Sequence, residues 1–306
     1  MESSITNVSG KPLSAEELQS LLEGKPDVSE IHLRSCDLQD GQIKAIVSLP
    51  SFRSLRVLEL GCTDIGPEGF QMLLQADFFP QLEKLLLYQN VIGNRGLRAI
   101  EHIAPHATLT HLNVCGNQLG PAAAEILAKA PLKALRSLHI GYNQLGDEGA
   151  QILAEIQHTS PLEELNIKLN ALGPRGVAFL MQGPFLRGIQ KLSFEQSPLG
   201  DEGVMHIAQS PHASSLRFLH LGDTQMGLEG LRKLCSSPWL RHLEILRLDH
   251  NFLGSEALEP LTNATFSQHL QELVLNKTQI THQALKDAFG PLGGKVYEEG
   301  RVLFAR

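Results

Sequence analysis

Cysteine is rare in this sequence, and the few cysteines present are scattered. Four cysteines occur in 306 residues, at Cys36, Cys62, Cys115 and Cys235, and no two of them have CxxC spacing. A small disulfide-built fold needs a denser set, and a structural zinc site needs paired ligands at short spacing. We therefore expect four free thiols in a reducing compartment and no zinc site built on cysteine.

The sequence also lacks an excess of basic charge and a long hydrophobic run. With 26 basic and 33 acidic residues its formal net charge is −7, which gives no general attraction to nucleic acid or to an anionic membrane. It has no apolar run of the roughly 18 residues that a membrane span needs. The N-terminus has neither the basic start nor the apolar segment of a secretory signal peptide. These features predict a cytoplasmic protein that neither spans a membrane nor binds nucleic acid.

What the sequence does contain is one short motif that returns many times. LGDEG occurs at Leu145–Gly149 and again at Leu199–Gly203, and its relative IGPEG occurs at Ile65–Gly69. Aligning the copies gives the frame LxxLxLxxNxLG, which recurs at steps of 27 residues with a single step of 26. Its ninth position falls at Cys36, Thr63, Asn90, Asn117, Asn143, Asn170, Ser197, Thr224, Asn251 and Thr278. A motif at a fixed interval is typical of a repeat architecture and not of a catalytic site.

Each repeat has a strand half and a helix half. The LxL segment alternates as a short strand does, and the residues after the motif have helical spacing. We expect the first glycine of the motif, such as Gly146, to adopt a backbone conformation that other residues resist. The second, such as Gly149, should let neighbouring helices approach closely. The acidic residues between them are expected to face water and to stabilise the start of the helix.

The LxxLxLxxN frames and the length of the strand–helix repeat resemble the leucine-rich repeat family, in its ribonuclease-inhibitor-like subfamily, from about Val28 to Gly290. The resemblance implies an α/β solenoid in the form of a horseshoe, with a parallel β-sheet on the concave face and α-helices on the convex face. The ribonuclease inhibitors are rich in cysteine and alternate longer repeats. This chain has four cysteines and a uniform repeat of 27 residues. It therefore resembles the subfamily and not those inhibitors.

The repeat frame predicts a single domain over residues 1–306. It divides into an N-terminal helical cap at 1–27, ten repeats at 28–290 and a C-terminal hairpin cap at 291–306. Ser14 and Glu17 have the spacing of a capping box that opens a helix, and Lys295–Phe304 has the pattern of a hairpin with its turn near Gly300. The frame leucines and Phe194 are expected to be core, and each buried aliphatic side chain contributes roughly 1.5–3 kcal/mol before entropy. The ninth-position Asn or Thr should bind backbone groups of the loop.

In this architecture the outward strand positions form the concave surface, which suits a protein partner better than a small molecule. Acidic and basic residues on it are nearly balanced, which disfavours nucleic acid. Large exposed side chains on such a face are candidate contacts, because aromatic and arginine side chains often dominate binding energy. The predicted partner-binding residues are Leu86, Tyr88, His111, His139, Tyr142, Lys168, Phe218, His220, Ile245, Arg247 and Asp249. The alternative is that these are scattered surface residues without a common role.

Two polar clusters on the same face have a chemical and a structural interpretation, and we favour the structural one. His111 and His139 are predicted to lie side by side, but two histidines without a third ligand rarely hold a metal. A second cluster would be either an acid–base or metal constellation or a solvated face with ion pairs. It consists of His220, Asp223, Arg247, Asp249 and His250. The sequence has no Ser-His-Asp order, phosphate loop or HExxH motif, so we expect no catalytic, metal or cofactor-binding residues.

The function predicted from these features is a monomeric protein–protein interaction module that binds its partner through the concave face, without catalysis of its own. One alternative is a regulator of a small GTPase, because GTPase-activating proteins of the Ran type look similar in architecture and repeat length. This chain does not have their acidic C-terminal tail. A second alternative is a bacterial effector, because stand-alone chains of this subfamily are similar to bacterial proteins delivered into eukaryotic cells. The effector would act on a host protein in the host cytoplasm.

Overall fold

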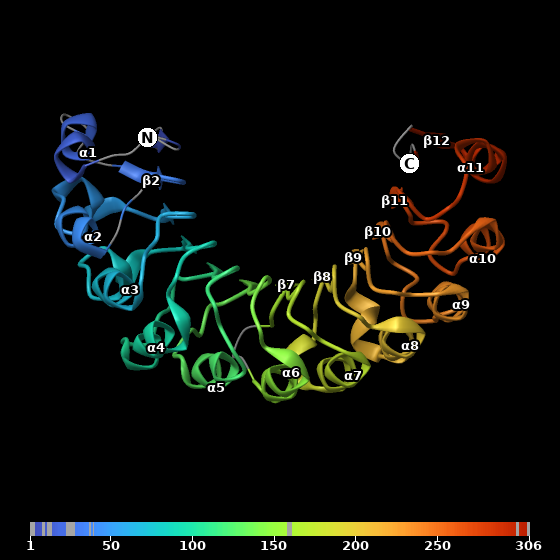
Figure 1. Ribbon diagram of the computed structural model, residues 1–306, viewed down its shortest axis with the longest axis horizontal. Coiled ribbons are helices and arrows are strands. Elements are labelled where there is room, and N and C mark those ends of the chain that lie inside the picture. Colours follow the sequence, from blue (N-terminus) through green and yellow to red (C-terminus); the bar gives the residue numbers. More distant parts are fainter. Residues whose placement is uncertain are drawn as a thin grey trace. The chain divides into compact units, whose positions relative to one another are not determined.

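The computed structural model describes residues 4–7, 10, 14–22, 28–36, 38, 40–157, 161–297 and 300–304 (Figure 1). Strands and helices alternate along the chain, as the sequence predicts. The structure divides into two compact units, an N-terminal unit up to residue 145 and a C-terminal unit from residue 146 onward. The prediction that the whole chain forms one domain stays a prediction. No helix among the described residues is long and apolar enough to cross a membrane.

The described part of the N-terminal unit contains six parallel strands in sequence order, β1 to β6. The strands are β1 (Ser4–Asn7), β2 (Val28–His32), β3 (Val57–Glu59), β4 (Lys84–Leu86), β5 (His111–Asn113) and β6 (Ser137–His139). The α-helices are α1 (Ala15–Leu22), α2 (Asp40–Ile46), α3 (Pro67–Leu74), α4 (Gly93–Leu97) and α5 (Ala122–Lys129). Short 3-10 helices occur at η1 (Pro50–Ser54), η2 (Phe79–Gln81) and η3 (Arg98–His102).

Among its described residues, the C-terminal unit has five parallel strands, β7 to β11, followed by an antiparallel hairpin. The strands are β7 (Glu164–Asn166), β8 (Lys191–Ser193), β9 (Phe218–His220), β10 (Ile245–Arg247), β11 (Glu272–Val274), β12 (Gly294–Val296) and β13 (Arg301–Phe304). The α-helices are α6 (Gly146–Ala154), α7 (Pro174–Gln182), α8 (Gly200–Gln209), α9 (Leu228–Cys235), α10 (Leu258–Thr262) and α11 (His282–Phe289). The 3-10 helices are η4 (Pro184–Leu186), η5 (Pro211–Ser215), η6 (Ser255–Ala257) and η7 (Gly290–Leu292).

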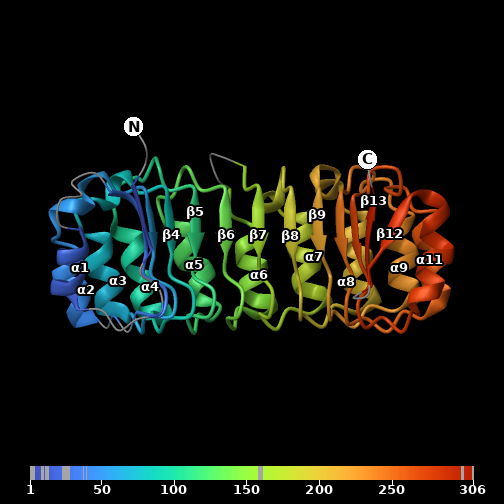
Figure 2. The same ribbon diagram turned by 90° about the horizontal axis from the view of Figure 1, so that it is seen from above.

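In each unit the strands form one layer and the helices another, with the core between them (Figure 2). The central residue of each repeat strand points into this core. Leu85 of β4 lies in register with Leu112 of β5, and both are at most 1% exposed. Phe194, which the frame places inward, is fully buried, so that prediction is confirmed. The opposite side of the strand layer, turned away from the helices, is called the sheet face below.

The ninth-position asparagines bind loop backbone, as predicted. The Asn90 Nδ2 donates to the carbonyl oxygens of Leu60 at 2.7 Å and Leu87 at 2.9 Å. Its Oδ1 accepts from the backbone nitrogen of Ile65 at 2.9 Å. Leu60 and Ile65 belong to the preceding repeat, so one buried amide joins two consecutive loops whose polar groups would otherwise lack partners.

The repeats form pairs that the uniform length of 27 residues conceals. In one set the motif glycine is left-handed, with φ of +60° at Gly93 and +61° at Gly146, as expected. In the intervening set the same position is extended, with φ of −98° at Gly66 and at Gly173, so the expectation is wrong there. Instead, the residue two positions earlier in the repeat is left-handed in that set, at Asp64, Gln118, Ala171, Gln225 and Gln279. Two loop conformations therefore alternate along the chain.

The acidic side chains of the motif connect the members of each pair. Asp147 was predicted to face water, and this prediction is wrong. Its Oδ1 accepts from the backbone nitrogens of Gly173 at 2.8 Å and Gly176 at 2.9 Å. These glycines open α7 in the next repeat, where backbone N–H groups have no partner within the helix. Equivalent contacts join Asp40 to Gly66 at 2.7 Å, Asn94 to Gly120 at 3.1 Å and Asp201 to Gly227 at 2.7 Å. An aspartate at this position lies in the first turn of its own helix and also binds the start of the next helix, so its carboxylate is turned toward backbone N–H groups and away from water.

The capping box and the hairpin predicted for the two ends of the chain are both present among the described residues. The Ser14 hydroxyl accepts from the backbone nitrogen of Glu17 at 3.1 Å, and the Glu17 carboxylate accepts from the backbone nitrogen of Ser14 at 2.7 Å, which confirms the capping box. Strand β1, which pairs with β2, was not predicted. The C-terminal hairpin is confirmed, and β13 pairs directly with β11. Gly300, near which the turn was predicted, has φ of +69°, and residues 298 and 299 lie outside the described residues.

Candidate functional site

The predicted partner-binding residues divide between the two units. Leu86, Tyr88, His111, His139 and Tyr142 belong to the N-terminal unit, and the other six belong to the C-terminal unit. Nearly all of them are half-buried on the sheet face, because neighbouring strands cover part of each side chain. Tyr142, at the end of β6, is 41% exposed.

Tyr88 is not the freely exposed aromatic residue that the sequence predicts. Its hydroxyl donates to Glu59 Oε1, and the other oxygen of Glu59 lies 2.5 Å from His32 Nδ1. Burial raises the pKa of Tyr88 and would also raise that of Glu59. For Glu59 the hydrogen bonds from Tyr88 and His32 outweigh burial and lower its pKa. Tyr88 is therefore held in a polar cluster, with only part of its ring left for a partner.

The two histidines of the N-terminal unit do not lie directly opposite each other. His111 is in register with Ser137, and His139 is in register with Asn113, so the histidines are diagonal neighbours. The His111 Nδ1 lies 2.8 Å from the Thr110 hydroxyl, which orients the ring within its own strand. The prediction that they lie side by side is wrong, because His139 is two residues further along its strand than the residue opposite His111.

The C-terminal unit brings the remaining residues together on three neighbouring strands. Phe218 of β9 and Ile245 of β10 are directly opposite in register. The guanidinium carbon of Arg247 lies 5.6 Å from the centre of the Phe218 ring, a cation–π geometry. The ring of His220 packs edge-on against the same phenylalanine at 6.3 Å. Phe218, His220, Ile245 and Arg247 are called the Phe218 patch below.

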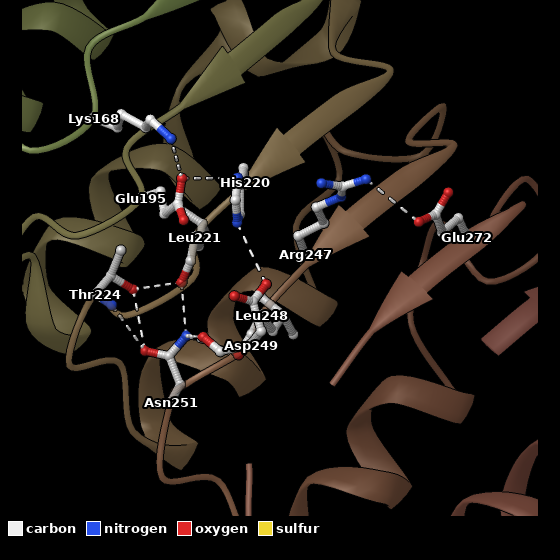
Figure 3. A network of polar contacts seen from close by, with 10 residues as sticks. All are labelled: Lys168, Glu195, His220, Leu221, Thr224, Arg247, Leu248, Asp249, Asn251 and Glu272. Atoms are coloured by element: carbon white, nitrogen blue, oxygen red, sulfur yellow. Dashed lines mark hydrogen bonds and ion pairs between the residues drawn. The ribbon is translucent and has the colours of Figure 1, made fainter. Parts of the chain in front are cut away.

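A row of ionisable side chains, Lys168, Glu195, His220 and Asp249, runs through this patch (Figure 3). The Lys168 Nζ is 2.9 Å from Glu195 Oε2, and this same oxygen is 3.7 Å from His220 Nδ1. On the other side of the ring, His220 Nε2 is 3.4 Å from Asp249 Oδ1. The sequence predicts ion pairs here, and it groups His220 with Asp249 correctly. Glu195 was not among the predicted residues. It occupies the same position of the repeat frame as Lys168 and Asp249, and residues at this position form one outward column across the strands.

The row is made possible by a glycine in that column. A Cβ at Gly222 would lie 2.8 Å from His220 Nε2 and 2.8 Å from Asp249 Oδ2, closer than real side chains approach. Burial would raise the pKa of Asp249, but its contacts with His220 outweigh burial and lower that pKa. Asp223 and His250, which were predicted to belong to this cluster, are exposed at the strand ends.

A second ion cluster fixes the far side of the patch. Glu272 of β11 is buried, and both of its oxygens lie 3.1 Å from the guanidinium of Arg301 on β13. The Arg247 Nη2 is 3.6 Å from the same carboxylate (Figure 3). The fork-shaped pair is strong because guanidinium and carboxylate match in geometry. The Glu272 carboxylate positions Arg247 over Phe218. The repeat pattern does not predict the Glu272–Arg301 pair, because Arg301 belongs to the C-terminal hairpin and not to a repeat.

The patch borders a shallow hollow of about 370 Å³ in the C-terminal unit. Its walls are mainly polar and come from β7 to β10, including Asn166, Lys191, Ser193 and Glu195, with Phe218 and Arg247 at one side. The hollow has the size of one or two side chains of a partner, and it is open to solvent.

The comparisons with known proteins agree with this architecture. The family model described as Leucine Rich repeat matches residues 53–74, 133–154, 158–181 and 212–235. Among solved structures, the chain is similar to an internalin from Listeria monocytogenes, with 18% identity and a TM-score of 0.52, over 91% of this chain and 82% of that chain. It is also similar to a chain of the yeast Rad7 and Elc1 complex, with 14% identity and a TM-score of 0.47, over 89% and 86%. No curated protein sequence matches the chain.

The repeat frame, the strand–helix alternation and the matches to the repeat model define the class of this protein. It has the fold of an α/β leucine-rich repeat solenoid, and four of its segments match the Leucine Rich repeat model. Membership of the ribonuclease-inhibitor-like subfamily stays a prediction from the sequence.

Proposed function

We propose that this protein is a protein-interaction module, without catalysis of its own, which binds a partner protein through the sheet face of its C-terminal unit. The Phe218 patch is the centre of the contact. Leucine-rich repeats hold their frame residues in the core and leave the outward strand positions to vary, so specificity is set on the sheet face.

The stacking of Arg247 on Phe218 is the observation that carries this proposal. The two side chains are already ordered, because Glu272 fixes Arg247 and β10 holds Ile245 beside Phe218. An ordered aromatic–arginine pair loses little conformational entropy on binding, and such residues often dominate interface energy. The adjacent hollow offers a site into which one partner side chain would insert.

The experiment is affinity capture followed by mass spectrometry, with the full-length chain as bait. The test bait carries Phe218→Ala and Arg247→Ala together. The control bait carries Phe252→Ala and Arg241→Ala, which removes the same two residue types from exposed positions outside the patch. A third bait carries Leu86→Ala and Tyr88→Ala and tests the N-terminal unit. Circular dichroism first establishes that every bait is folded.

A partner retained by the wild type and the control bait, and lost by the Phe218→Ala/Arg247→Ala bait, supports the proposal. Its affinity for each purified bait is then measured by titration calorimetry, and we expect a loss of about 2 kcal/mol or more for the test bait. Equal affinity for the test and control baits would overturn the assignment to this patch.

The captured partner also distinguishes the finer alternatives from the sequence. A small GTPase whose hydrolysis rate rises in the presence of this chain would favour a regulator of the Ran-type kind. A eukaryotic protein bound by a chain of bacterial origin would favour an effector. A monomer in a reducing cytoplasm remains our expectation for either case.

A further inference from the structure

Two carboxylates face the two ring nitrogens of a single histidine. Glu195 Oε2 lies 3.7 Å from His220 Nδ1, and Asp249 Oδ1 lies 3.4 Å from His220 Nε2. A neutral imidazole carries one N–H, so it donates to one of these carboxylates and presents a lone pair to the other. The lone pair and the two carboxylates together can bind one positively charged group, such as a metal ion.

The three side chains are largely withdrawn from solvent. Only 12% of the His220 side chain is exposed, with 23% for Glu195 and 19% for Asp249. Gly222 stands between the two acids in the outward column, and a Cβ there would fill the space beside His220 Nε2 and Asp249 Oδ2. That nitrogen is buried and has no hydrogen-bond partner of ordinary geometry within the described residues.

We propose that Glu195, His220 and Asp249 form a binding site for a divalent transition-metal ion of the zinc type. Each residue offers one ligand atom, and the three atoms lie within 4.8 Å of one another, so small side-chain movements bring them to one ion. One imidazole and two carboxylates are a ligand set that Zn²⁺ accepts, and three protein ligands leave a coordination position for water. The mixed set disfavours Mg²⁺ and Ca²⁺, which prefer oxygen ligands alone.

Lys168 competes with the metal ion for Glu195. Its ammonium lies 2.9 Å from Glu195 Oε2, and it supplies part of the positive charge that the two acids require. Arg247 is held over Phe218 and paired with Glu272, so it is directed to a different carboxylate. Removing the lysine charge should therefore strengthen metal binding. If the three side chains form only ion pairs and bind no metal, the same change would lower the stability of the fold without any effect on metal affinity.

The test is calorimetric titration of the metal-stripped full-length chain with Zn²⁺ alone. We expect one equivalent to bind, with affinity falling at least about tenfold in Glu195→Gln and in Asp249→Asn and further in His220→Ala. Lys168→Met should bind more tightly than the wild type. His269→Ala is the matched control, because the exposed His242 and His269 rings lie 5.4 Å apart and are the obvious place for adventitious zinc.

NMR of the histidine rings keeps the test decisive where a variant fails to fold. In the wild type, one equivalent of Zn²⁺ should shift the His220 ring nitrogens before those of His242 and His269. Zinc that binds only at the exposed pair, or binding that survives His220→Ala unchanged, would overturn the proposal. So would a His220 ring that titrates with protons and does not respond to Zn²⁺.

Discussion

Asp147 of one repeat binds the helix start of the next repeat, with its Oδ1 2.8 Å from the backbone nitrogen of Gly173. The same oxygen accepts from Gly176 at 2.9 Å. Gly173 is the N-cap of α7 and Gly176 lies in its first turn, where backbone N–H groups need an acceptor from outside the helix. An aspartate that stabilises its own helix by charge would do so equally well from either acidic position of the motif. Only Asp147, and not Glu148, reaches the neighbouring helix.

Asp147→Ala should destabilise the protein by about 1–2 kcal/mol, the usual cost of losing a helix-capping side chain. Glu148→Ala is the matched control, because Glu148 is exposed and carries the same charge at the same helix end. Its free energy of unfolding should stay within about 0.5 kcal/mol of the wild type. Urea denaturation of the three proteins checks this, and equal losses in both variants would reduce Asp147 to a helix-dipole effect.

Asn251 and Thr224 occupy the same frame position in consecutive repeats but should differ sharply in importance. Asn251 Nδ2 donates to the carbonyls of Leu221 and Leu248, and its Oδ1 accepts from the backbone of Thr224 and Met226. Asn251→Ala leaves these four groups buried and without that partner, which should cost about 3–5 kcal/mol.

Thr224→Ala is the comparison for Asn251→Ala. Leu221 O accepts from both the Thr224 hydroxyl at 2.9 Å and Asn251 Nδ2 at 2.7 Å, so the carbonyl keeps one donor when the hydroxyl is removed (Figure 3). We expect a loss of about 1 kcal/mol, measured by chemical denaturation. If Thr224→Ala lowered the free energy of unfolding as much as Asn251→Ala does, the conclusion that the asparagine holds the two loops together would be contradicted.

Gly61 and Tyr88 should be strongly coupled. A Cβ at Gly61 would lie 2.3 Å from Tyr88 Cζ, so alanine there displaces the ring and breaks its hydrogen bond to Glu59. Gly61→Ala should therefore destabilise the wild type but have little effect in a Tyr88→Ala background. A double-mutant cycle should give a coupling energy of about 1–2 kcal/mol. Additive losses would mean that the glycine is required by its backbone and not by the tyrosine.

The repeat frame made much of this architecture predictable from the sequence. Burial of Leu85 and Phe194, the capping box at Ser14 and the pairing of Phe218 with Ile245 all follow from residue spacing alone. Spacing fixes these features because each repeat places the same position at the same height on neighbouring strands. A residue's column therefore predicts its neighbours across the sheet.

Features that depend on side-chain direction or on the caps were not predictable in this way. Tyr88 was read as exposed because the frame gives its column but not the carboxylate of Glu59 beneath it. Arg301 reaches Glu272 only because β13 inserts beside β11 in antiparallel register, which lies outside the repeat. The pairing of repeats was hidden because alternation of loop conformation changes backbone angles and not repeat length.

His106 should make the stability of the protein depend on pH. The ring is buried, its Nε2–H donates to Phe79 O at 2.7 Å, and its Nδ1 accepts from the backbone nitrogen of Leu109 at 3.0 Å. Burial lowers the pKa of His106 below its ordinary value of 6.5. Protonating Nδ1 would also remove the acceptor that Leu109 uses. The folded state thus prefers the neutral ring.

Because the folded-state pKa is the lower one, the unfolded chain binds the proton first as the pH falls. The contribution of His106 to stability is fully present above pH 6.5, its value in the unfolded chain, and is lost as the pH falls through the folded-state pKa. We expect His106→Gln to flatten the change in unfolding free energy between about pH 7.5 and pH 5, measured by urea denaturation. His102→Gln, at an exposed histidine of η3, should keep the wild-type dependence. An unchanged slope in His106→Gln would assign the acid sensitivity to other groups.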